Sequence, residues 1–226
     1  MSLPPKVGEP EVFDPDLWSI LWLSVQVTGT VVIISSLIGI PLGAWLGLAQ
    51  FRAKRLVRAV VHTGMALPPV VVGLVVYLLL SRSGPLAALG WLFTPQAMIL
   101  AQIILALPWV VGITMSVVAA VPAELLLQVR SLGASRWQAR WTLLWEARQG
   151  VILAVAAAFG RSVSEVGAVW MVGGNIQDHT RVLTTAIVVE TGKGQFALAL
   201  ALGAWLLGLA LLTNLVIVRA QGRPQT

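Results

Sequence analysis

Five long runs of apolar residues dominate the 226-residue sequence, and each is long enough to cross a lipid bilayer. A transmembrane helix needs about 20 consecutive, mostly apolar residues to span the hydrocarbon core. The runs cover residues 17–50, 57–80, 95–121, 147–172 and 196–218. Charged residues make up only 11% of the chain, against roughly 25% in soluble domains. The sequence therefore predicts an all-α integral membrane protein with five transmembrane helices.

Prolines interrupt three of these runs. Pro41 lies in the first, which is too long for one upright span, while Pro68-Pro69 and Pro108 lie in the second and third. Kinked or broken helices are tolerated in membranes where neighbouring helices or water satisfy the freed backbone groups. We therefore expect the first helix to tilt or kink, and the second and third to be irregular.

Basic residues set the expected orientation. They gather in the first loop, the third loop and the C-terminal tail: Arg52, Lys54, Arg55, Arg58, Arg130, Arg136, Arg140, Arg148, Arg219 and Arg223. Positive charge marks cytoplasmic loops, so the N-terminus is predicted outside and the C-terminus in the cytoplasm. Residues 1–16 would form an external tail, 17–218 the transmembrane domain and 219–226 a cytoplasmic tail. The net charge of +6 thus reflects membrane topology and not nucleic-acid binding.

The N-terminal stretch is acidic and rich in proline, without the basic region that opens a cleavable signal peptide. We expect the first apolar run to insert and to remain in the membrane. The chain has no cysteine, which excludes disulfides, thiolate metal sites and cysteine nucleophiles.

The cytoplasmic loop at residues 122–146 carries the pattern of two short helices. Pro122 suits the first turn of a helix, and Gly133 would end that helix. Ser135 and Gln138 match a capping box that opens the next helix. Apolar residues at helical spacing follow each start: Leu125, Leu126, Val129 and Leu132, then Trp137, Trp141 and Trp145. The loop is either an anchor on the lipid surface or a docking element for a cytoplasmic partner.

The stretch RSLGASRWQ in this loop resembles the EAA loop of ABC importer permeases, and Glu146–Gly150 resembles the start of their next span. The match departs from the family pattern where Leu127-Gln128-Val129 replaces Glu-Ala-Ala and where Leu144-Trp145 replaces Leu-Pro. The resemblance implies a type I ABC importer permease fold, with a coupling helix that docks on an ATPase subunit. The residues implied in coupling are Leu127, Gln128, Arg130, Ser131, Leu132, Gly133, Ala134 and Ser135.

A second resemblance covers the chain from about residue 16 to its end. The stretches SEVGAV, MVGGNI and TRVLTTAIVVETGKGQFALALALG are similar to tungstate-type oxyanion permeases, close relatives of molybdate permeases. The resemblance implies a homodimer in the inner membrane of a bacterium or archaeon. It also implies two cytoplasmic ATPase subunits, which would hold ATP and magnesium, and an external oxyanion-binding protein. The choice of tungstate over molybdate, sulfate or phosphate rests on this resemblance.

Several catalytic patterns are absent from the sequence. It contains no G-x-x-x-x-G-K-[ST] for nucleotide phosphates and no G-x-S-x-G for a nucleophilic serine. His62 and His179 suit an interfacial and a solvated position, and Asp178 with His179 is too little for a metal site. We therefore expect no enzyme activity, cofactor or metal in this chain.

Two other functions are compatible with the spans. A secondary transporter or channel would explain them, but it would leave the organised loop without a purpose. A membrane scaffold or enzyme would need a soluble partner domain or a set of catalytic residues.

The fourth apolar run keeps two opposite charges, Arg161 and Glu165, four residues apart. Charges inside a membrane are costly and usually pair toward the bundle interior. On one continuous helix they would share a face with Gly160, Ser164 and other small residues. We interpret the pair as fixing the packing of this span, with direct contact to an anion as the alternative.

Polar residues beside this pair are candidates for a translocation path, because hydroxyl and amide donors can pass an anion without trapping it. Arg181 would attract the anion from outside. The candidates are Ser164, Asn175, Thr180, Arg181, Thr184 and Thr185. Ordinary capping and packing is the alternative interpretation of the threonines.

Overall fold

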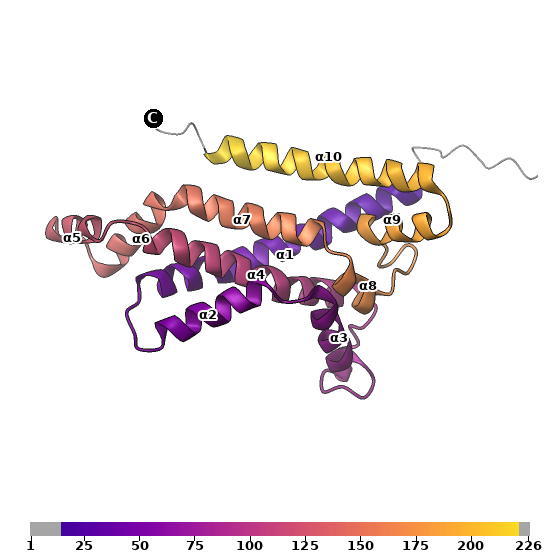
Figure 1. Cartoon of the computed structure of the whole chain (residues 1–226), viewed down its shortest axis with the longest axis horizontal. Coiled ribbons are helices and arrows are strands. Elements are labelled where there is room, and N and C mark those ends of the chain that lie inside the picture. Colours follow the sequence, from indigo (N-terminus) through magenta and orange to yellow (C-terminus); the bar gives the residue numbers. More distant parts are fainter. Residues whose placement is uncertain (1–14, 222–226) are drawn as a thin grey trace, which may run out of the picture.

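The computed structural model describes residues 15–221, and the elements it contains there are helical (Figure 1). Within this range there are ten α-helices and one 3-10 turn, which lies between α3 and α4. In chain order they are α1 (Pro15–Leu48), α2 (Lys54–Met65), α3 (Pro69–Leu80), η1 (Ala87–Leu89), α4 (Pro95–Ala119), α5 (Ala123–Ser131), α6 (Arg136–Glu146), α7 (Arg148–Val163), α8 (Gly167–Gly173), α9 (Leu183–Gly192) and α10 (Phe196–Gln221).

Three helices in the described part of the chain can cross a membrane alone: α1, α4 and α10. Two bent pairs, α2 with α3 and α6 with α7, would raise the number of crossings to five. The helices α1, α4, α7 and α10 run along the long axis of the molecule (Figure 1). These helices agree with the predicted all-α membrane fold.

The two ends of the molecule differ in the elements they carry. One end holds α5, α6, the connection from α1 to α2, and the last turn of α10, whereas α3, α8 and α9 lie toward the other end (Figure 1). The basic first and third loops therefore share one end, as the predicted orientation requires. At that end the Lys54 ammonium donates hydrogen bonds to the carbonyls of Gly47 and Ala49, at 2.9 and 2.8 Å, where α1 ends.

Helices α1 and α4 approach each other closely along a stripe of glycines. Gly39, Gly43 and Gly47 recur every four residues on α1. A Cβ added at Gly43 would lie 2.7 Å from the Val111 carbonyl oxygen on α4, closer than real contacts allow. Small residues let helix backbones approach in lipid, where van der Waals packing replaces the hydrophobic effect between helices. This stripe fixes α1 on α4.

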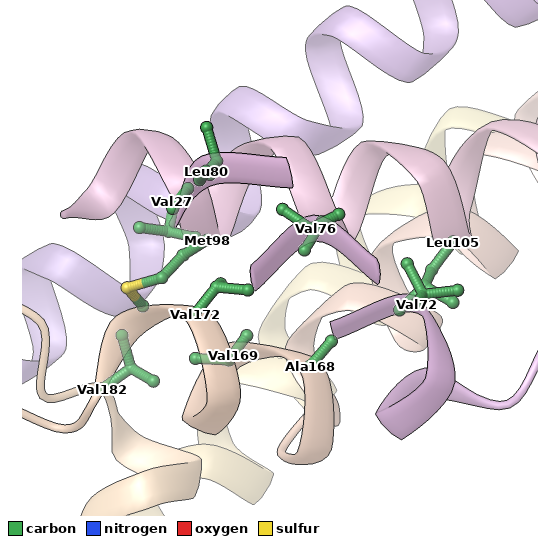
Figure 2. Packing of buried hydrophobic residues seen from close by; sticks show 12 residues of the cluster. Val27, Val72, Val76, Leu80, Met98, Leu105, Ala168, Val169, Val172 and Val182 are labelled. Atoms are coloured by element: carbon green, nitrogen blue, oxygen red, sulfur yellow. The ribbon is translucent and has the colours of Figure 1, made fainter. Parts of the chain in front are cut away.

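A second packed region joins α3, α4 and α8 with α1. Figure 2 shows Val76, Met98 and Val172 converging from three of these helices, with Val27 behind them. A Cβ added at Gly73 on α3 would lie 2.8 Å from the Ala168 Cα on α8, so only glycine allows the two helices to approach this closely. The short helix α8 is thus held by its neighbours on both sides.

The second apolar run, expected at 57–80, is not one helix. Helices α2 and α3 meet at an angle of 93°. Pro68 caps α3 and Pro69 opens it, so neither residue can donate the amide hydrogen bond that would continue α2. Helix α2 has no buried residue and carries Arg55, Arg58 and His62. Its Val57 and Val61 pack against the buried cluster of Leu46, Val111 and Met115, so α2 lies beside α4 whereas α3 turns away from the axis of α4 (Figure 1).

Prolines in the first and third runs do not end their helices. Pro41 lies inside α1 and Pro108 inside α4. Of the expected external tail, residues 1–14 lie outside the described part of the chain, and Pro15 and Asp16 open α1. Of the expected cytoplasmic tail, residues 219–221 belong to α10 and residues 222–226 lie outside the described part.

Candidate functional site: the broken fourth span and the cytoplasmic loop

The fourth apolar run is broken at residues 164–166. Helix α7 ends at Val163, Ser164 caps it, and α8 begins at Gly167. Since α7 has 16 residues, it is about 24 Å long at the α-helical rise. It starts at the cytoplasmic end, so the break falls in the outer part of a hydrocarbon core of about 30 Å. The prediction of one continuous helix through residues 147–172 is therefore wrong beyond Val163.

Glu165 occupies the break and is only 3% exposed. Its Oε2 accepts a hydrogen bond from the Arg161 guanidinium at 2.7 Å, which forms the ion pair that the spacing suggested. Its Oε1 accepts from the Ala168 amide at 2.9 Å, at the start of α8. One carboxylate thus neutralises the arginine and satisfies an amide that opens a helix.

Other side chains satisfy the backbone groups that the break frees. The Thr184 hydroxyl of α9 donates to the Glu165 carbonyl at 2.9 Å, and Ser164 Oγ donates to the Gly160 carbonyl at 2.8 Å. Gln102 Nε2 of α4 donates to the Ser162 carbonyl at 3.4 Å. Broken helices persist in membranes only where such partners exist. The break is therefore a built feature that links α7 to α4 and α9.

The segment at 173–195, expected as an outer loop, contains the apolar helix α9. Ser24 of α1 anchors this helix because its Oγ accepts from the Leu183 amide at 2.9 Å. Leu183 and Ala186 pack against Ile20 and Leu202 in a further buried cluster. The segment is therefore part of the packed bundle, although turns precede and follow the helix.

The three threonines of the candidate path are buried, and each hydroxyl is engaged. Thr180 Oγ1 donates to the Gly173 carbonyl at 2.6 Å and accepts from the Ile176 amide at 2.9 Å. Thr185 Oγ1 donates to the Val182 carbonyl at 3.0 Å and accepts from the Val182 amide at 3.1 Å. With Thr184 on the Glu165 carbonyl, these hydroxyls hold local structure, as capping and packing would require.

The remaining candidates are less buried than the threonines. Ser164 is exposed, and Asn175 and Arg181 are half-buried in the turn between α8 and α9. Asn175 Oδ1 and Arg181 Nε are both buried with no hydrogen-bond partner in the part of the chain that the structure describes. Asn175 also adopts a left-handed backbone conformation, with φ of 49°. Unsatisfied polar atoms near a turn mark a place where a ligand or a rearrangement could supply partners.

A small polar cavity of about 10 Å³ lies between α1, α4, α7 and α9. Its polar lining comprises Ser24, Thr28, Gln102, Ser162, Glu165 and Thr184. Gln102 Oε1 and Ser162 Oγ are buried there without a partner among the described residues. A cavity of this size has room for about one water molecule. This polar cavity is therefore too small for an oxyanion to pass through a single chain in this conformation.

Sequence reasoning missed Ser24, Thr28 and Gln102 as members of this cluster. A signal was present, because polar side chains in the middle of apolar spans usually face the bundle interior. Only the structure shows that helices far apart in the sequence bring them to the same place as Glu165.

The cytoplasmic loop forms two helices at one end of the molecule. Gly133 has φ of 88°, a left-handed conformation that suits glycine and ends the turn after α5. Ser135 Oγ accepts from the Gln138 amide at 3.2 Å, and Gln138 Oε1 accepts from the Ser135 amide at 2.8 Å. The capping box thus forms as the sequence indicates. Pro122 caps α5 instead of lying in its first turn.

The candidate coupling residues lie on the outside of this loop. Ala134 is half-buried, and the others, Leu127, Gln128, Arg130, Ser131, Leu132, Gly133 and Ser135, are exposed. Leu127 is 66% and Leu132 88% exposed, which is unusual for leucine outside an interface or a membrane. The structure therefore presents an apolar edge on α5 at the cytoplasmic end.

Comparison with known families matches residues 39–222 to the binding-protein-dependent transport system inner membrane component. A Haloferax volcanii protein named probable anion ABC transporter permease is 45% identical over 92% of this chain and 91% of its own length. The tungstate uptake system permease TupB of Peptoclostridium acidaminophilum is 41% identical over 92% of both chains.

Among solved structures, a chain of the MetNI methionine ABC transporter in an inward-facing conformation matches with a TM-score of 0.70. The match covers 93% of this chain and 100% of that one at 24% identity, so it identifies the fold as that of a type I ABC importer permease. With α5 and α6 at the cytoplasmic end and the family match spanning most of the bundle, this chain belongs to the binding-protein-dependent transport system inner membrane components, the permease subunits of ABC importers.

Proposed function

We propose that this chain is the permease subunit of an ATP-driven importer for tungstate. The observation that carries the proposal is the 41% identity to a tungstate uptake permease over 92% of both chains. The relative named an anion permease supports the same class of substrate. The chain is not itself the catalyst, and ATP hydrolysis belongs to a separate cytoplasmic ATPase that holds ATP and magnesium.

The working unit is a homodimer with two ATPase subunits and an external oxyanion-binding protein. The cavity beside Glu165 has a volume of about 10 Å³, too small for an oxyanion, which supports a path between two copies. Helix α3 offers a surface for a second copy because Val70, Val71 and Val75 are all at least half exposed. The binding protein would dock at the end that carries α3, α8 and α9.

ATP-driven closure of the ATPases reaches the spans through α5. The exposed leucines Leu127 and Leu132 would enter a groove on the ATPase, and α6 would pass the movement to α7. Helix α6 meets α7 at 66°, so a displacement of the loop turns directly into a displacement of the fourth span.

The outer part of the path runs past the broken fourth span. Ser164, Asn175 and Arg181 would contact the anion, because their polar atoms are exposed or lack partners among the described residues. Thr180, Thr184 and Thr185 would form the wall that holds these residues in place. Arg161 and Glu165 would fix the hinge between α7 and α8, since their charges already neutralise each other.

Reconstitution tests the proposal. Liposomes that contain this chain, its ATPase and its binding protein should accumulate tungstate only when ATP is supplied. Uptake that persists without the ATPase would contradict an ABC importer and favour a channel or secondary transporter.

Substrate choice is tested on the external binding protein, which we expect to hold the selective site. Calorimetric titration with tungstate, molybdate and sulfate should show the strongest binding for tungstate. Stronger binding of molybdate or sulfate would reassign the substrate and leave the permease function intact.

A further inference from the structure

Two adjoining pockets lie at the cytoplasmic end, between the last turns of α1 and the helices of the cytoplasmic loop. The first has a volume of about 250 Å³ and the second about 270 Å³. Trp45, Leu48 and Arg140 line both. The two pockets therefore adjoin, and we call them together the α1–α6 groove.

One end of the α1–α6 groove is cationic. Arg130, Arg136 and Arg140 line it, and none of their three guanidinium groups forms an ion pair or hydrogen bond with a described residue. Elsewhere in the described chain, Arg161 pairs with Glu165 and Lys193 with Glu190. Guanidinium groups bind phosphate in a planar, two-pronged geometry. Three free guanidiniums beside one pocket thus suit a phosphate group.

The other end of the groove is apolar. Apart from Arg140, the residues that line it are carbon-rich, among them Pro41, Ala44, Trp137, Trp141 and Leu144. A free oxyanion would leave this part unfilled, whereas a molecule with a phosphate and a hydrocarbon chain would fill both ends.

The depth of the groove places it at the lipid headgroups. Trp22 and Trp45 are exposed on α1 and lie 23 residues apart, about 35 Å at the α-helical rise. Tryptophans collect at the two membrane interfaces, which flank a hydrocarbon core of about 30 Å. Trp45 then marks the cytoplasmic interface, where anionic lipids give the leaflet a negative surface.

We propose that the α1–α6 groove binds one anionic phospholipid of the cytoplasmic leaflet. Its phosphate lies against Arg130, Arg136 and Arg140, and an acyl chain runs along Trp45 and Trp141. The lipid would tie the end of α1 to α6, the helix that leads from the loop into α7. This proposal does not depend on which oxyanion is transported.

Native mass spectrometry of the purified full-length chain in detergent tests the proposal. Phosphatidylglycerol and phosphatidylcholine with identical acyl chains serve as probes. The variant Arg136→Gln/Arg140→Gln should lose binding of phosphatidylglycerol by about 25-fold and bind phosphatidylcholine as before, since each basic residue near an anionic headgroup contributes to affinity. The control Arg52→Gln/Arg58→Gln removes two exposed arginines at the same end but outside the groove, and it should keep the preference.

A second variant tests the apolar end independently. Ala44→Phe fills the groove beside Trp45 and leaves every arginine in place. It should weaken long-chain phosphatidylglycerol and leave the dihexanoyl form unaffected, because the short chains do not need the apolar end.

Three outcomes would overturn the proposal. The first is an unchanged lipid preference in Arg136→Gln/Arg140→Gln, and the second is equal effects of Ala44→Phe on both chain lengths. The third is displacement of the lipid by millimolar inorganic phosphate, which would indicate a free-anion site. An unchanged lipid preference together with loss of ATPase assembly would assign the arginines to a protein partner instead.

Discussion

The charges at the break in the fourth span and those in the cytoplasmic loop are arranged in opposite ways. At the break, Glu165 is 3% exposed, and its two oxygens are used by Arg161 and by the amide of Ala168. In the loop, Arg136 and Arg140 are exposed, and their guanidinium groups have no ion-pair or hydrogen-bond partner among the described residues.

This difference indicates what each region is for. A buried charge must be neutralised and hydrogen-bonded within the chain, because nothing outside can reach it. An exposed charge at a membrane interface can remain unpaired until a partner, a headgroup or water meets it. The break is thus closed within this chain, whereas the loop is open to other molecules.

The largest expected effect comes from removing the carboxylate at the break. Glu165→Ala deletes the partner of Arg161 and the acceptor of the Ala168 amide. Breaking a buried ion pair on one side costs about 3–5 kcal/mol, so we expect a much lower yield of folded protein and earlier unfolding. Tryptophan fluorescence during heating in detergent measures this. The control Glu146→Ala removes an exposed carboxylate, and equal unfolding of both variants would contradict the comparison.

A neutral pair separates packing from contact with the anion. Arg161→Gln/Glu165→Gln removes both charges, keeps the size of the side chain at 165 and an acceptor for the Ala168 amide, and shortens the side chain at 161. Failed assembly would support a packing role for the charges. Near-normal assembly with lost uptake would instead place the pair in contact with the substrate.

The next effect concerns the link between the break and α9. Thr184→Val keeps the shape of the side chain but leaves the buried Glu165 carbonyl without its hydroxyl donor. An unsatisfied buried group costs about 1–3 kcal/mol, so the thermal midpoint should fall by less than in Glu165→Ala. Thr191→Val is the matched control, since Thr191 donates to the Ile187 carbonyl on an exposed face. A larger fall of the thermal midpoint in Thr191→Val than in Thr184→Val would contradict a stabilising role of Thr184 at the break.

Much of this arrangement could be predicted from local sequence, and the rest could not. The spans of α1, α4 and α10, the capping box at Ser135 and the pairing of Arg161 with Glu165 follow from apolar run length and helical spacing. The break itself does not, because no proline or glycine stands at residues 164–166. Its stability comes from Gln102 and Thr184, whose approach depends on how distant helices pack.

The glycines of α1 could have predicted a close helix contact from the sequence alone. Gly39, Gly43 and Gly47 are spaced every four residues, a pattern that predicts close helix packing in lipid. Spacing identifies the face of α1 that packs, but it does not name the partner. The close approaches of Gly39 to Val110, Gly43 to Val111 and Gly47 to Met115 identify that partner as α4.

A smaller effect is expected at the start of α6. Ser135→Ala removes the acceptor for the Gln138 amide, and loss of such a cap costs about 1 kcal/mol. Because α6 lies at the open end, we expect faster amide hydrogen exchange in its first turn and little change in the midpoint of the whole chain. Ser131→Ala is the control, since Ser131 Oγ donates to the Gln128 carbonyl and caps no helix start. Exchange that is unchanged in Ser135→Ala would mean that lipid or packing, and not the cap, orders α6.

The smallest effect tests whether a local partner matters at the open end. Arg148 differs from Arg136 and Arg140 because its guanidinium lies 5.5 Å from the centroid of the Trp145 ring and donates to the Trp145 carbonyl at 3.2 Å. An exposed cation–π contact contributes about 0.5–1 kcal/mol, so Arg148→Gln should lower the thermal midpoint slightly. Arg148→Lys keeps the charge and should recover part of that loss, whereas Arg58→Gln should change nothing. Equal effects of Arg58→Gln and Arg148→Gln would mean that only the number of charges at this end affects stability. In that case the charges at the break would differ from those in the loop in their burial but not in their dependence on a specific partner.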